Sequence, residues 1–280
     1  MALTASLVII NYTYGIEERI ANFSSPWSSL LGFYFLFAFV FIGSYLIQSF
    51  IKRTALPADK FFHFLLLITP LMFAAKMSFD FLPSSVMQYL SFPSINYWVT
   101  VLHWPVIAAL MFLAILLIWK LGKYERPVFG MGRSYSSIFP YLLLLACMIP
   151  LLAIAASDEG FQQAYPRIKR IAYIYSIVKD PLLFELLYEL AYGSDFFTIE
   201  LFFRGFMVLA FARYVGMDAI LPMAAFYCTI HFGKPLPECI TSFFGGLILG
   251  AVVVHTRSIW GGLIIHLGIA WLMELAGWIA

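Results

Sequence analysis

The chain has 280 residues, of which 62% are hydrophobic, 19% aromatic and only 11% charged, and its formal net charge is +2. Soluble globular domains contain roughly 25% charged and 45–50% apolar residues, so this composition excludes a soluble enzyme, a disordered chain and a coiled coil. A small net charge without a basic stripe also argues against nucleic-acid binding. The remaining class is a multi-pass integral membrane protein. At about 20 apolar residues per spanning helix, its length allows about seven or eight spans.

The N-terminal part of the chain contains four apolar segments with the length of spanning helices. They are about Ser28–Ile51, Phe61–Leu82, Tyr97–Trp119 and Ile138–Ala156. The stretch that follows, Ser157–Lys179, mixes basic residues with tyrosines. This mixture is typical of a segment that lies at the level of the lipid headgroups.

The C-terminal part of the chain begins with a helix start signal at Asp180-Pro181, an N-cap acid followed by proline. We expect Gly193-Ser194-Asp195 to break that helix, with Ser194 capping a new one over about Phe196–Ala212. The last three apolar segments are about Ile220–Phe232, Cys239–Val254 and Ser258–Trp278. The sequence therefore predicts an all-α membrane bundle with about eight transmembrane helices.

Ionisable residues are scarce in the first four spans and more frequent in the spans after residue 180. Charged side chains in a bilayer are costly and usually have a function. We therefore expect one membrane domain in two parts. Residues 1–179 form N-terminal membrane helices with the interfacial segment, and residues 180–280 form the candidate catalytic helices.

The strongest polar signal is Glu200 with Arg204, four residues apart and with the acid first, the order that favours a pair on one helical face. This pair is equally consistent with a structural ion pair, since a buried Glu needs a partner. His231 lies near the end of one span and His266 lies inside the last span. Either histidine alone is equally consistent with a packing residue whose ring is satisfied by a hydrogen bond.

Together, one carboxylate and two imidazoles from three helices can perform hydrolytic chemistry. A carboxylate can take a proton from water, and an imidazole can orient that water or stabilise an oxyanion. Glu200, His231 and His266 are also a three-ligand set of the kind that binds catalytic zinc. A site with a divalent metal such as zinc and a site without metal therefore both remain open.

The order of these motifs resembles the CPBP family, which contains CAAX prenyl endopeptidases and bacteriocin-processing membrane proteases. The family pattern is EExxxRG, then FxxxH, then HxxxN. Glu200 matches the second Glu, Arg204-Gly205 the Arg-Gly, Tyr227 to His231 the FxxxH motif, and His266 the final His. The resemblance covers about Asp180–Ala280.

The resemblance implies a membrane-embedded endopeptidase that acts on a protein or peptide substrate at or within the bilayer. In it, Glu200 and Arg204 anchor the site and the Glu assists as a base, while His231 and His266 orient water or hold metal and stabilise the oxyanion. Two family positions differ here, because Ile199 replaces the first Glu and Ala270 replaces the final Asn.

Three other acids are candidates for the missing base, namely Glu185, Glu189 and Glu238. The two departures also motivate an alternative, a catalytically inactive relative that serves as a membrane scaffold or binds a membrane partner. A third interpretation is a transporter or channel, because intramembrane acids, arginines and histidines can form a relay.

Overall fold

The computed structural model describes residues 2–79, 93–132 and 138–279, which fold into helices and contain no strand. The chain divides into two compact units. Unit 1 consists of Met1–Phe79, Ile115–Gly132 and Leu201–Ser258, and unit 2 consists of Asp80–Ala114, Arg133–Glu200 and Ile259–Ala280. Each unit thus combines stretches from both parts of the sequence. The division at residues 179 and 180 stays a prediction.

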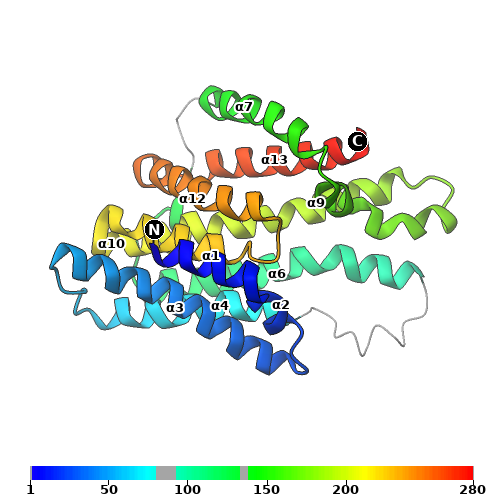
Figure 1. Cartoon of the computed structure of the whole chain (residues 1–280). Helices are drawn as coiled ribbons and strands as arrows, with labels where there is room; N and C mark the ends of the chain where they lie inside the picture. The colour runs from blue at the N-terminus through cyan, green and yellow to red at the C-terminus, as the bar shows by residue number, and fades with distance from the viewer. Residues whose placement is uncertain (1, 80–92, 133–137, 280) are drawn as a thin grey trace. The chain divides into compact units, whose positions relative to one another are not determined.

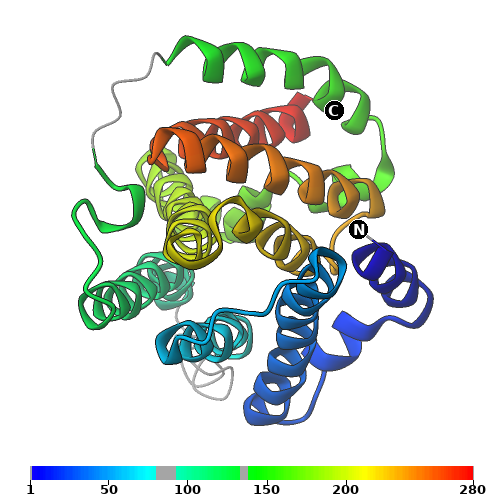
Figure 2. The same cartoon turned by 90° about the vertical axis from the view of Figure 1, so that its left-hand side faces the viewer.

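Unit 1 is a bundle in which α3 packs along α4 and α11, and α11 packs along α12 (Figures 1 and 2). The N-terminal helix α1 lies against α2, α3 and α11. The helices of this unit are α1 (Ala2–Tyr14), α2 (Ile16–Ala21), α3 (Pro26–Lys52), α4 (Lys60–Ser78), the end of α6 (Pro93–Leu121), η1 (Val128–Gly130), η3 (Glu200–Ala210) except its first residue, α10 (Phe211–Val215), η4 (Gly216–Ala219), α11 (Ile220–Thr229) and α12 (Leu236–Thr256).

Aromatic side chains fill the core of unit 1. The ring of Phe226 in α11 lies 4.8 Å from that of Phe37 in α3, centroid to centroid, and Phe41 contacts Phe211 at 5.2 Å. Glycine lets α12 approach α11 closely, because a Cβ at Gly246 would lie 3.2 Å from the Cα of Ala224. Close helix contact through small residues is typical of membrane bundles.

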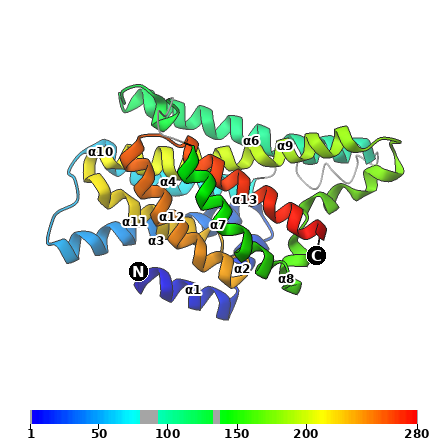
Figure 3. The same ribbon diagram turned by 90° about the horizontal axis from the view of Figure 1, so that it is seen from above.

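Unit 2 is built around α13, which packs against both α7 and α9 (Figure 3). Glycines in α13 make room for α7, because a Cβ at Gly268 would collide with the side chain of Leu145. The remaining helices of this unit are most of α6, α7 (Phe139–Ala155), α8 (Glu159–Ala164), η2 (Arg167–Ser176) and α9 (Leu182–Ile199), together with α13 (Trp260–Ile279).

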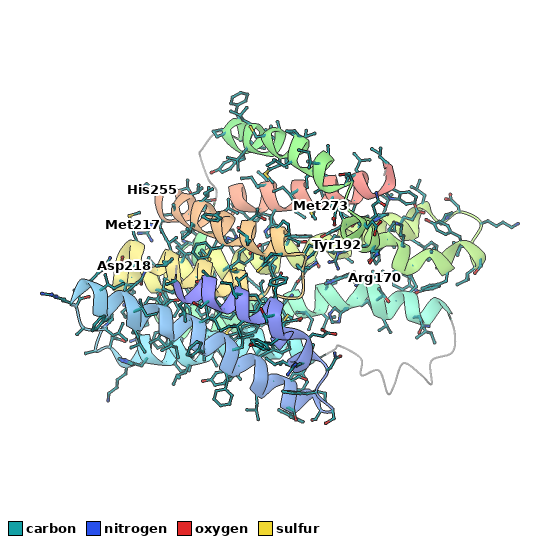
Figure 4. All side chains as sticks on the ribbon, in the orientation of Figure 1. Arg170, Tyr192, Met217, Asp218, His255 and Met273 are labelled. Atoms are coloured by element: carbon teal, nitrogen blue, oxygen red, sulfur yellow. The ribbon has the colours of Figure 1, made fainter. Side chains whose placement is uncertain are left out.

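A buried acid fastens η2 to α13 within unit 2. The carboxylate of Glu274 accepts hydrogen bonds from the backbone N–H of Arg167, at 2.7 and 3.0 Å, and from that of Ile168 at 3.3 Å. These N–H groups lie at the start of a helix, where they lack helical partners and favour negative charge. The Arg167 guanidinium lies 5.6 Å from the ring of Tyr192, which is labelled in Figure 4.

Five helices are long and apolar enough to cross a membrane, judged by length and composition among the described residues. They are Pro26–Lys52, Lys60–Ser78, Ile95–Leu121, Leu236–Thr256 and Trp260–Ile279. Two further apolar helices, α1 and α7, are shorter. The prediction of an all-α bundle is confirmed. The count of about eight spans stays a prediction, and the predicted end of the second span at Leu82 lies outside the described residues.

The predicted helix break at Gly193-Ser194-Asp195 is wrong. Helix α9 starts at Leu182, with its N–H bonded to Asp180 Oδ1 at 3.2 Å, and it runs without interruption to Ile199 before passing into η3. Gly193 serves close packing instead, because a Cβ there would lie 3.3 Å from Cδ2 of Leu267 in α13. Ser194 caps nothing, and its hydroxyl donates to the Ala191 carbonyl one turn earlier.

Candidate active site

A buried carboxylate–imidazole pair joins two helices of unit 2. Glu200 is 0% exposed, and its Oε1 lies 2.9 Å from Nδ1 of His266 in α13. When the carboxylate is ionised it can only accept a hydrogen bond, and Nδ1 of the imidazole is then the donor. In the neutral ring, Nε2 is then the nitrogen without a proton, and it can accept one.

Two neighbours fix this pair in place. A Cβ at Gly262 would overlap Oε2 of Glu200, so only glycine leaves room for the carboxylate at this position. Gly262 precedes His266 by four residues, so α13 presents the space and the imidazole on the same face. The ring of Phe196, one turn before Glu200, packs against the His266 ring at 5.0 Å between centroids.

The backbone changes its hydrogen-bond register at the carboxylate. Glu200 is the first residue of η3, an 11-residue π-helix that follows α9 directly. π-helical turns are rare and occur frequently at functional sites. Arg204 lies further along η3, in unit 1. Its predicted ion pair with Glu200 stays a prediction.

Arg204, Tyr227 and His231 form a second cluster, within unit 1. Arg204 is also 0% exposed, and its guanidinium carbon lies 4.0 Å from the ring centroid of Tyr227, a cation–π contact. The Tyr227 ring meets the His231 ring at 4.7 Å in an edge-to-face arrangement. Tyr227, at the aromatic position of the FxxxH motif, thus places its ring between Arg204 and His231.

The hydrogen bond of His231 determines the protonation of its neutral ring. Nδ1 lies 2.9 Å from the backbone carbonyl oxygen of Tyr227, one turn earlier. A carbonyl oxygen can only accept, so Nδ1 carries the proton and Nε2 is the accepting nitrogen. Both histidines therefore use Nδ1 for a hydrogen bond within the fold, and in each neutral ring Nε2 is the nitrogen without a proton.

The structure places the predicted site residues in these two groups. Glu200 and His266 lie together in unit 2, and Arg204 and His231 lie with Tyr227 in unit 1. That the two groups face one reacting centre stays a prediction. Sequence reasoning missed Gly262 and Phe196. The available signal was the Gly261-Gly262 pair one turn before His266.

The three acids considered as candidates for the missing base do not contact the Glu200–His266 pair in any described hydrogen bond or ion pair. Glu185 accepts a hydrogen bond from the Tyr175 hydroxyl at 2.7 Å, and Glu238 lies 3.9 Å from the ammonium of Lys234. Because α9 is unbroken, Glu189 shares a face with Glu200. Eleven residues at 1.5 Å per residue still separate the two by about 16 Å along the helix. Glu189 therefore cannot act on a water that is bound to Glu200.

The two positions that depart from the family pattern are apolar and buried here. The exposed fraction is 8% for Ile199 and 3% for Ala270. Ala270 follows His266 by one turn on the same face of α13. Among the residues that the structure describes, no three His, Cys, Asp or Glu side chains are grouped so that they could hold a metal ion. A metal at Glu200, His231 and His266 stays a prediction.

Comparison with known families identifies the segment that carries this site. Residues 186–272 match the family model of Rce1-like type II CAAX prenyl endopeptidases. The match begins in α9 and ends in α13, and it contains Glu200, Arg204, His231 and His266. No curated protein and no solved structure was found to match the chain. The resemblance to the CPBP family is confirmed over residues 186–272, and the long apolar helices are those of a multi-pass integral membrane protein.

Proposed function

We propose that this protein is a membrane-embedded endopeptidase that hydrolyses a peptide bond with a water molecule activated by Glu200 and His266. The observation that carries the proposal is the buried hydrogen bond between Glu200 Oε1 and His266 Nδ1. A carboxylate that holds one imidazole nitrogen fixes the tautomer and the direction of the ring, and it stabilises the imidazolium that forms. The family match to CAAX prenyl endopeptidases supports the same reaction class.

In the proposed reaction, Nε2 of His266 takes a proton from water while the water oxygen attacks the peptide carbonyl carbon. The resulting imidazolium returns that proton to the amide nitrogen as the carbon–nitrogen bond breaks, which releases a carboxylic acid and an amine. In this proposal His231, whose Nδ1 bonds the Tyr227 carbonyl, orients water or stabilises the oxyanion. The Arg204 guanidinium packs on the Tyr227 ring, and that ring in turn packs on the His231 ring and holds its position.

The first substrate to test is a prenylated peptide that ends in a CAAX sequence, because the matched family is named for that activity. The assay uses the full chain in lipid vesicles and measures release of the terminal tripeptide. We expect Glu200→Gln, His231→Ala and His266→Ala each to lower kcat at least about a hundredfold, the contribution typical of a general base. His255→Ala is the matched control, because this histidine also bonds a backbone carbonyl but is exposed.

If all three variants cleave the peptide at the wild-type rate, the proposed site is wrong. The second candidate function is a non-catalytic membrane protein that binds a partner, and the buried Ile199 and Ala270 favour it. That candidate predicts no cleavage of prenylated or unprenylated peptides by the wild type, together with co-purification of one specific membrane protein.

A further inference from the structure

The loop that carries His231 is contacted by helices that lie outside the family-matched segment. This loop, residues 230–235, joins α11 to α12 in unit 1, and side chains of α1 and α2 of the same unit contact it. Its internal hydrogen bonds are of the turn type: the His231 N–H donates to the Cys228 carbonyl at 3.1 Å, and the Lys234 N–H donates to the His231 carbonyl at 3.0 Å. His231 therefore lies in a turn whose backbone also has partners outside the loop.

Asn11 in α1 makes the most buried of these contacts. Its side chain is 3% exposed, and its Nδ2 donates to the carbonyl oxygen of Phe232 at 3.1 Å. Its Oδ1 accepts from the backbone N–H of Glu17 in α2 at 2.9 Å. One amide side chain thus connects α1, α2 and the residue directly after His231.

Two neighbours of Asn11 contact the same loop. The hydroxyl of Tyr12 donates to the carbonyl of Lys234 at 2.5 Å. The carboxylate of Glu17 rests on Gly233, where an added Cβ would lie 2.8 Å from Oε2 of the acid. The backbone of residues 232–234 is therefore contacted at three successive positions by α1 and α2.

Local sequence explains how α1 and α2 reach the loop. Gly15 separates the two helices and adopts a φ of 63°, a left-handed conformation that glycine takes at little cost. This turn brings the Glu17 N–H back to Asn11. Leu7, one turn before Asn11, is buried with Ala224, Cys228 and Phe232 in one apolar cluster. Apolar packing thus fixes the position of α1, and the polar side chains of Asn11 and Tyr12 then hydrogen-bond to the loop.

The same contacts assign a structural role to a motif in the sequence. Asn11-Tyr12-Thr13 has the pattern of an N-glycosylation acceptor. In the folded chain, the nitrogen that would carry the glycan is buried and bonded to Phe232. The asparagine is therefore part of the interior of unit 1.

We propose that Asn11 is a positioning residue for His231, acting through its hydrogen bond to the Phe232 carbonyl. This inference rests on the proposed peptidase function. In this inference the N-terminal helices, which the family model does not cover, align His231. A small displacement of a group that orients water can cost about a hundredfold in rate without loss of substrate binding.

Kinetics of paired variants test the proposal. We expect Asn11→Ala to lower kcat roughly tenfold to a hundredfold and to leave KM within about twofold. Asn11→Asp keeps the acceptor for Glu17 but removes the donor to Phe232, so it should show the same loss. Asn22→Ala, at an exposed asparagine after α2, is the control and should retain the wild-type kcat.

A double-mutant cycle separates positioning from general destabilisation. If Asn11 acts through His231, Asn11→Ala should lower kcat less than about twofold further in a His231→Ala background. An equal loss in both backgrounds, or a wild-type kcat in Asn11→Ala, overturns the proposal.

If Asn11→Ala does not fold, Tyr12→Phe removes one hydroxyl that bonds the same loop. Tyr14→Phe, at a residue that is 60% exposed in the same helix, is its control. Tyr12→Phe should then lower kcat only where His231 is present, and a loss that persists in the His231→Ala background overturns the proposal.

Hydrogen exchange distinguishes failure of this proposal from failure of the proposed function. Amide exchange at residues 230–235 needs no substrate, and Asn11→Ala or Tyr12→Phe should accelerate it at least about tenfold relative to their controls. Unchanged exchange refutes the loop contacts whatever the activity. The variants can show accelerated exchange while the wild type cleaves no peptide. That combination upholds the positioning of His231 and refutes only the peptidase assignment.

Discussion

The glycine that makes room for Glu200 offers the sharpest test of the candidate site. A Cβ at Gly262 would overlap Oε2 of Glu200, whose side chain is completely buried. In Gly262→Ala the carboxylate must move, and movement breaks its 2.9 Å hydrogen bond to His266. Overpacking a filled interior costs about 1–3 kcal/mol, and losing a hydrogen bond to a charged group costs about 1.5–3 kcal/mol. Replacing glycine by alanine inside a helix returns only about 0.5–1 kcal/mol.

We therefore expect Gly262→Ala to be destabilised by about 2–5 kcal/mol and to lose at least about a hundredfold in kcat, because the imidazole loses the group that orients it. The assay combines denaturant unfolding in detergent with cleavage of the prenylated peptide in vesicles. Gly245→Ala in α12 is the matched control, because a Cβ there meets no atom within 4 Å. It should retain full activity and equal or higher stability.

A second substitution can relieve the predicted clash. Glu200→Asp shortens the acid by one methylene, so the double variant Gly262→Ala with Glu200→Asp should be more active than Gly262→Ala alone. A Gly262→Ala protein with the wild-type rate and stability would refute the reasoning, because it would mean that the carboxylate does not occupy the space above this glycine.

Three further predictions concern other described contacts. Ile199→Glu should lower stability and leave the cleavage rate no higher, because Glu200 already engages the imidazole and a second buried acid lacks a partner. A higher rate in a peptide assay would show that residue 199 is the position of the base. The thiols of Cys228 and Cys239 lie 3.6 Å apart, so mild oxidation with a copper–phenanthroline complex should join them, and alkylation of the chain after denaturation should then modify only the third cysteine. Alkylation of all three after oxidation would contradict this contact. Glu274→Gln should lower the free energy of unfolding by about 1–3 kcal/mol, because the carboxylate accepts bonds from two backbone N–H groups at the start of η2. Equal denaturation midpoints for variant and wild type would exclude that role.

The apolar segments were predictable because hydropathy and helix signals are local properties. The first predicted span, Ser28–Ile51, corresponds to α3 over Pro26–Lys52, and the last, Ser258–Trp278, corresponds to α13 over Trp260–Ile279. The break expected at Gly193 failed for a physical reason. Glycine favours both a turn and a close helix contact, and only the position of Leu267 in α13 shows which of the two applies.

By itself, the sequence determined the class of the protein, the order of its helices and the identity of the polar residues in its C-terminal part. These follow from composition and from spacing along single helices. Only the tertiary structure decided that Glu200 bonds His266, 66 residues away, and that Asn11 bonds the loop after His231 across 221 residues. Such contacts depend on which helix faces pack together, and many side chains distributed over the chain determine that packing. The glycine at 262 acquires its role only when α13 lies against the carboxylate at the start of η3.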